Sequence, residues 1–83
     1  QNIEKAIELN PRVELYYEDL GVAYGLMKNF DKSIEVSNRC LAYNPNYVPA
    51  LVNLSVSYRN KGDMNKANEY MAKAQQIKAT QPQ

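Results

Sequence analysis

Residue types that carry out catalysis are scarce in this chain. Its 83 residues contain no histidine, a single cysteine (Cys40) and three scattered glycines that form no phosphate-binding loop. Without histidine the chain lacks the commonest general base and the commonest metal ligand, and the thiol has no partner for nucleophilic catalysis. The adjacent acids Glu18 and Asp19 would point in different directions on a helix, so they make no paired-carboxylate site. We therefore expect no enzymatic activity, no metal and no cofactor.

The charge balance gives no reason to expect nucleic acid or an anionic membrane as partner. Ten basic and nine acidic residues leave a formal net charge of +1. Residues 1–41 hold seven acids and five bases, and residues 42–83 hold two acids and five bases, so the halves carry −2 and +3. Nucleic acids and anionic lipids attract a more concentrated positive charge. No apolar run reaches the ~20 residues that cross a bilayer, so we expect a soluble protein, with the cytoplasm favoured among compartments.

An internal repeat with a period of 34 residues organises the elements that must position any binding residue. The pairs at this offset include Asn10 and Asn44, Pro11 and Pro45, Leu20 and Leu54, Tyr24 and Tyr58, Lys32 and Lys66, and Glu35 and Glu69. Small residues recur in three copies at Ala6, Cys40 and Ala74. Helical amphipathicity alone would not keep this register, so the pattern indicates a repeated structural unit.

Each period contains two stretches whose apolar residues recur at three- and four-residue steps, the spacing of one helix face. The pattern predicts helices over 15–27, 31–43, 49–60 and 64–78, and residues 3–9 read as the end of an earlier helix. Turns are expected at Lys28-Asn29 and at Gly62-Asp63, and Pro45 ends the second helix because the residue before proline avoids the helical region. Gly62 suits a left-handed helix terminus.

These residues resemble the tetratricopeptide repeat. The family pattern is an aromatic residue, Leu-Gly, Tyr, then Ala, an aromatic and Pro at fixed spacings. The first full repeat reads Tyr17, Leu20, Gly21, Tyr24, Ser33, Ser37 and Pro45, and the second reads Leu51, Leu54, Ser55, Tyr58, Ala67, Met71 and Ala79. The departures, among them Ser33, Ser37 and Ser55, keep the size class or loosen the packing slightly.

The resemblance implies an all-α fold, a right-handed superhelical stack of antiparallel helix pairs (an α-solenoid) with five helices. It predicts one domain over residues 1–83 with about two and a half repeats. Residues 1–10 would be the second helix of a truncated repeat, 14–47 the first full repeat, and 48–81 the second. The polar residues Asn68 and Gln75 replace Ile34 and Leu41 of the preceding period, so we expect residues 64–78 to form a C-terminal capping helix.

Packing follows from the size pattern. We expect the large residues Tyr17, Tyr24, Phe30, Tyr58 and Met64 to fill the spaces between helices. Cys40 aligns with two alanines, so we expect a small buried core residue rather than a reactive thiol.

The concave face of such a stack is lined by the first helix of each pair. We expect it to comprise eleven residues: Leu15, Glu18, Asp19, Val22, Gly25, Leu26, Val52, Asn53, Val56, Arg59 and Asn60. Its valines would form the floor of a groove for a peptide, although isolated apolar surface residues are also common.

Three positions on this face suggest what the ligand would contribute. In peptide-binding members an asparagine at the place of Asn53 holds the ligand's main chain, and a solvated asparagine is the alternative. Glu18 and Val22 occupy the places where chaperone-tail-binding members carry lysine and asparagine, which argues against that ligand.

Three functions remain open. The first is a scaffold that binds a protein or peptide in the concave groove. The second is self-association through Ile3 and Ile7, which lack the first helix of their pair. The third is a recruiting segment of a larger enzyme, such as a glycosyltransferase.

Overall fold

The computed structural model describes residues 12–80 and contains four α-helices and no strand in that part of the chain. They are α2 (Arg12–Leu26), α3 (Phe30–Tyr43), α4 (Val48–Asn60) and α5 (Met64–Thr80). The four predicted full-repeat helices are confirmed, with ends that shift by up to three residues. The fifth expected helix, over residues 1–10, lies outside the described residues.

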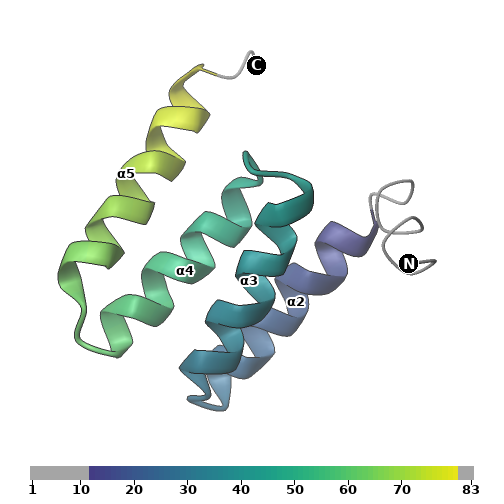
Figure 1. Ribbon diagram of the computed structural model, residues 1–83, viewed down its shortest axis with the longest axis vertical. Coiled ribbons are helices and arrows are strands. Elements are labelled where there is room, and N and C mark those ends of the chain that lie inside the picture. The colour runs from purple at the N-terminus through teal and green to yellow at the C-terminus, as the bar shows by residue number, and fades with distance from the viewer. Residues whose placement is uncertain (1–11, 81–83) are drawn as a thin grey trace.

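The helices stack in sequence order, as a solenoid does (Figure 1). α4 packs on both α3 and α5, and α2 packs on α3. α2 also contacts α4, so the first helices of the two repeats are neighbours. Since each helix meets the next along the chain and α2 also meets α4 across the stack, the two hairpins share one buried seam.

The turns that close the two hairpins have the same geometry one period apart. Lys28 and Gly62 both have positive φ, 63° and 90°. In each turn the backbone N–H of the following residue donates a hydrogen bond to a carbonyl in the last turn of the preceding helix. Asn29 donates to the Tyr24 carbonyl at 2.8 Å, and Asp63 donates to the Tyr58 carbonyl at 2.9 Å. The expected left-handed position at Gly62 is confirmed, and Lys28 adopts it as well.

Side chains at the same two turns cap the following helices. Asn29 Oδ1 accepts from the backbone N–H of Lys32 at 3.3 Å, and Asp63 Oδ1 accepts from Lys66 at 3.1 Å. Capping by Asn and Asp satisfies N–H groups that have no partner inside a helix. The 34-residue period therefore extends to the hydrogen bonds that start each second helix.

The core lies between the helices and mixes small apolar residues with serines. Its buried members are Val36, Cys40, Ala50, Leu51, Leu54, Ala67 and Ala74, with Ser33, Ser37, Ser55 and Ser57. The expected burial of Cys40 is confirmed, since it is 1% exposed. The placement of Met64 in the interior is wrong: it is 48% exposed, because it begins α5 ahead of the turn on which Ala67 is buried.

Three of the four buried serines are tied into hydrogen bonds between helices. Ser33 Oγ donates to the carbonyl of Gly21 at 2.9 Å, and Ser57 Oγ donates to Ser33 Oγ at 3.0 Å. Ser55 Oγ donates to the carbonyl of Ala67 at 2.7 Å. These bonds connect α2, α3 and α4 in one cluster and α4 to α5 in another.

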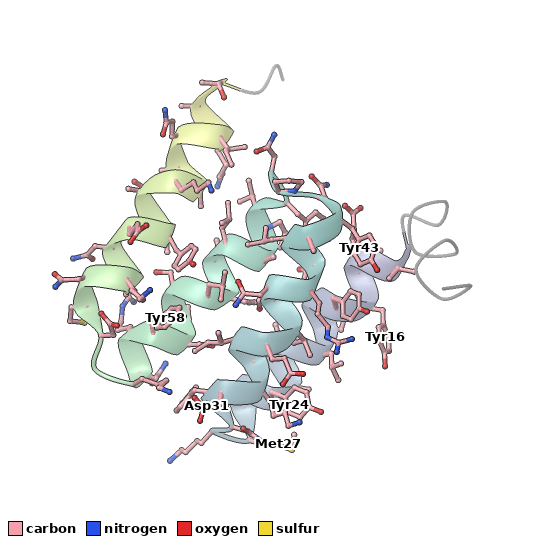
Figure 2. The ribbon with its side chains drawn as sticks, viewed as in Figure 1. Tyr16, Tyr24, Met27, Asp31, Tyr43 and Tyr58 are labelled. Atoms are coloured by element: carbon pink, nitrogen blue, oxygen red, sulfur yellow. The ribbon has the colours of Figure 1, made fainter. Side chains whose placement is uncertain are left out.

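Part-buried side-chain contacts also hold the helices of each repeat together. Glu14 accepts from Asn44 Nδ2 at 2.5 Å, and Glu18 accepts from the Tyr47 hydroxyl at 2.7 Å. Both bonds tether α2 to the segment between α3 and α4. Tyr58 projects from α4 (Figure 2). Its ring stacks on that of Tyr70 of α5 with centroids 5.7 Å apart, which fills space between those helices.

Candidate functional site

A groove runs between the C-terminal halves of α2 and α4, with a cavity volume of about 400 Å³. We call it the α2–α4 groove. Its lining residues are Gly21, Val22, Gly25, Leu26, Lys28, Phe30, Ser33, Asn53, Val56, Ser57 and Asn60. The groove opens where the first helices of adjacent repeats lie side by side, and it reaches the turn between α2 and α3.

Six of the eleven residues expected on the concave face line this groove. They are Val22, Gly25, Leu26, Asn53, Val56 and Asn60. The other five, Leu15, Glu18, Asp19, Val52 and Arg59, do not. Leu15, Glu18 and Asp19 precede Gly21, the first residue of α2 that lines the groove. Val52 and Arg59 are sequence neighbours of the lining residues Asn53 and Asn60, so they lie on another side of α4. Glu18 has a further reason, because its carboxylate is held by the Tyr47 hydroxyl.

Five lining residues were not expected from the sequence: Gly21, Lys28, Phe30, Ser33 and Ser57. Ser33 and Ser57 belong to the core between helices, and their hydroxyls form part of the groove wall because the helices cross there with small residues. Lys28 and Phe30 lie at the turn between α2 and α3. The sequence feature that could have indicated these residues is the small size of Gly21, which lets the groove extend down to α3.

Apolar side chains form the exposed rim of the groove. Val22 is 45% exposed, Val56 42% and Leu26 81%, and all three are among the exposed large hydrophobic residues of the described chain. Exposed apolar side chains that gather around a cavity, rather than scatter, mark a surface that binds something. The hydroxyls of Ser33 and Ser57, which line the groove below this rim, bond to each other. These two polar groups therefore need no hydrogen bond from a ligand.

Two asparagine amides supply the polar groups of the groove. Asn53 Nδ2 donates to the carbonyl of Glu18 at 3.3 Å, and Asn60 Nδ2 donates to the carbonyl of Val56 at 2.8 Å. Each amide is oriented by a backbone carbonyl, and its Oδ1 has no donor among the described residues. Asn53 faces the groove and also connects α4 to α2, a contact that the sequence did not predict.

The described residues contain one thiol and no cluster of metal-ligating side chains. Among them no three His, Cys, Asp or Glu side chains come together as ligands for a metal ion. Burial raises the pKa of the Cys40 thiol to about 11, and the carboxylates of Glu14 and Glu18 act in the same direction. A thiol with a raised pKa is a poor nucleophile, and Cys40 does not line the groove.

The comparison with known families decides what kind of repeat this is. A model of the tetratricopeptide repeat matches residues 15–47 and again residues 48–81. The chain belongs to the tetratricopeptide repeat family. The two matched units coincide with the two stacked hairpins, so the groove lies between adjacent repeats of this family.

Three curated relatives share one name, peroxisomal targeting signal receptor, and come from three organisms. The peroxisomal targeting signal receptor of Kluyveromyces lactis is 32% identical over 69 residues, which cover 83% of this chain and 12% of the receptor. The receptor of Saccharomyces cerevisiae is 32% identical over 68 residues, covering 82% and 11%. That of Candida glabrata is 31% identical over 71 residues, covering 86% and 12%. The chain thus spans only about a tenth of the length of these receptors.

The family and the relatives together favour a role in protein–protein interaction. The part of the chain that the structure describes contains no helix long and apolar enough to cross a membrane.

Proposed function

We propose that this tetratricopeptide repeat chain binds a peptide, or an extended segment of another protein, in the α2–α4 groove. The observation that supports this proposal is the cavity between the first helices of two adjacent repeats, rimmed by Val22, Leu26 and Val56. Its volume of about 400 Å³ falls within the range of ligand sites, and it would hold one or two side chains of a longer segment.

The groove can supply both affinity and orientation to such a segment. Burial of apolar surface is worth roughly 25 cal/mol per Å², and the valine and leucine side chains of the rim would provide that surface. The Oδ1 atoms of Asn53 and Asn60 can accept hydrogen bonds from main-chain N–H groups of an extended peptide. An extended segment has unpaired N–H groups along its length, so the two amides suit it well.

The relatives favour a peptide ligand as well. Their names describe receptors for a peroxisomal targeting signal, and a targeting signal is a short segment of the protein that carries it. In the wider α-solenoid that the family forms, the first helices line a concave surface, and we place the groove on that right-handed superhelical surface.

The proposal is tested with peptides selected from a random displayed library against the 83-residue chain. Val22→Asp and Val56→Asp place a charge on the apolar rim, and we expect each to weaken the binding of selected peptides by tenfold or more. Met64→Asp is the matched control, because Met64 is similarly exposed, at 48%, and lies on α5 outside the groove. Helicity measured by circular dichroism shows that each variant is folded. Binding that survives both valine substitutions unchanged would refute the proposal.

The two other functions have less support. Self-association rests on Ile3 and Ile7, which lie outside the described residues. A recruiting role in a larger enzyme such as a glycosyltransferase draws on no feature of residues 12–80 beyond the same groove.

A further inference from the structure

The packing of the protein does not explain why residue 25 is a glycine. Gly25 lies in the last turn of α2, and glycine in a helix is unfavourable relative to alanine. Gly21 is needed for close packing, because a Cβ there would lie 3.1 Å from Asn53 Nδ2, and Gly62 is needed for its φ of 90°. Gly25 has neither constraint: a Cβ there would meet nothing within 4 Å. The space that its side chain would occupy belongs to the α2–α4 groove.

Lys28 is the second groove residue that the fold does not explain. Its φ of 63° lies in the left-handed region, which disfavours residues with a Cβ. At the equivalent position of the next repeat the chain has Gly62, which adopts that conformation without strain. A side chain kept in an unfavourable conformation at the edge of a cavity points to a function for that side chain.

The charges around the groove are arranged to favour an anion at this end. Lys28 is the one charged residue among the described residues that line it. The nearest acid in the sequence, Asp31, forms an ion pair with Lys61, and the Glu18 carboxylate is bonded to Tyr47. Lys28 itself has no acidic partner within residues 12–80, so its ammonium is available to a ligand.

We propose that the occupant of the α2–α4 groove is a peptide segment in which an apolar side chain is followed by an aspartate or glutamate. The apolar side chain lies over Gly25 between Val22 and Val56, and the carboxylate of the next residue pairs with the Lys28 ammonium. This assignment rests on the proposed function, and it adds the chemistry of the ligand. It commits to an acidic side chain rather than to the carboxylate at a chain end.

Peptides selected from the random library, without bias in composition, test the assignment. We expect them to share an apolar residue followed by Asp or Glu. Replacing that acid by its amide should weaken binding about fivefold at low salt, the size of one partly exposed ion pair, and added salt should reduce the difference. Amidation of the peptide's own C-terminus should leave binding within twofold.

Variants of the chain connect the peptide's acid to Lys28. Lys28→Glu should weaken the acidic peptides about tenfold and should bind their lysine-substituted versions better than the unsubstituted chain does. Lys73→Glu is the control, because it makes the same charge change on an exposed position of α5 outside the groove. Gly25→Leu should abolish binding by filling the cavity, whereas Gly25→Ala should weaken it several-fold while the helix becomes more stable.

The outcomes separate the two proposals. Selected peptides that depend on Val22 and Val56 but show no acid preference, or that lose binding on amidation of their C-terminus alone, would overturn the assignment of the ligand and leave the groove's function intact. Equal effects of Lys28→Glu and Lys73→Glu would overturn it too. Peptides that ignore the valines and Gly25→Leu altogether, or a failure to select any peptide, would overturn both.

Discussion

The hydroxyl of Ser33 on α3 donates a hydrogen bond of 2.9 Å to the backbone carbonyl of Gly21 on α2. One period later the equivalent positions are Ala67 and Ser55, and the bond recurs at 2.7 Å with the serine on the first helix and the carbonyl on the second. Each repeat thus replaces one of its two small crossing residues by serine and bonds it to the other. A buried hydroxyl at a close crossing is tolerated because a helix carbonyl has a second lone pair to offer.

The bond between Ser57 and Ser33 makes these two residues energetically coupled. Ser33→Ala removes a donor to Gly21 and leaves the buried Ser57 hydroxyl without its acceptor, so we expect a loss of about 1–3 kcal/mol in the free energy of unfolding. Ser57→Ala should cost about 1 kcal/mol. In the double variant no hydroxyl is stranded, so its loss should be smaller than the sum, as urea denaturation would show. Strictly additive losses would contradict the coupling.

Ser37 is the buried serine that has no such bond. Its hydroxyl has no hydrogen-bond partner among the described residues, and the side chain is 1% exposed. Ser37→Ala removes an unsatisfied polar group and improves helix propensity, so we expect unfolding to require about 1 kcal/mol more. Thermal melting would show this as a raised midpoint. Ser55→Ala is the matched comparison, because its hydroxyl is bonded, and it should lower the midpoint instead.

The fold could be predicted from the sequence because the residues that determine it recur at a fixed period. The 34-residue offset specifies both hairpins, and the same offset relates the caps Asn29 and Asp63 and the turn residues Lys28 and Gly62. A position that must hold a small residue can also be recognised from the repeat, because Cys40 aligns with alanines. These features depend on local conformation and on the contact of each hairpin with the next. The repeat pattern contains the information for both.

The groove was predictable only in part, because its shape depends on exceptions to the period. Helical spacing places Val22 and Val56 on one face, but it spreads that face along the whole of α2 and α4. The cavity begins only at Gly21 and Asn53 and includes the open space beside Gly25, a position that holds Arg59 one period later. The sequence predicts Lys28 only as a turn residue, since a single sequence does not show that the turn borders a cavity.

The left-handed conformation of Lys28 predicts a stabilising substitution. Lys28→Gly removes the steric conflict of Cβ at positive φ, and we expect it to raise the free energy of unfolding by about 0.5–1 kcal/mol despite the greater freedom of glycine in the unfolded chain. Gly62→Lys at the equivalent turn should lower it by a similar or larger amount. Opposite shifts in the urea midpoint would bear this out. A Lys28→Gly variant less stable than the unsubstituted chain would show that the lysine side chain makes a stabilising contact.

The two glycines of α2 should respond differently to alanine. Gly25→Ala adds a methyl group in open space within a helix, so the free energy of unfolding should rise by about 0.5–1 kcal/mol. Gly21→Ala gains the same propensity, but its Cβ would lie 3.1 Å from Asn53 Nδ2 and 3.3 Å from Ser37 Oγ. The bond from Asn53 to Glu18 must then shift, and we expect little gain or a net loss. Equal gains at both positions in chemical denaturation would contradict the close crossing at Gly21.

The buried thiol of Cys40 makes stability depend on pH in the alkaline range. Its pKa rises from 9.0 to about 11, mainly through burial and further through Glu14 and Glu18. Above pH 9 the unfolded chain therefore loses this proton while the folded chain retains it. Since the state that binds more protons is favoured by acid, the contribution is complete below pH 9 and is lost as the pH rises toward 11.

Cys40→Ala, which copies the residue one period later at Ala74, isolates this effect. The variant should lose some stability at neutral pH through the cavity it creates, but its urea midpoint should fall less steeply between pH 9 and pH 11 than that of the unsubstituted chain. The pKa of Tyr47 is also raised, first by burial, then by its bond to Glu18 and to a lesser extent by Cys40, so most but not all of that contribution is common to both proteins. Parallel pH profiles would mean that the thiol ionises as readily in the folded chain as in the unfolded one. A thiol-reactive reagent offers a second readout, because a buried, protonated Cys40 should react only as fast as the helices around it open.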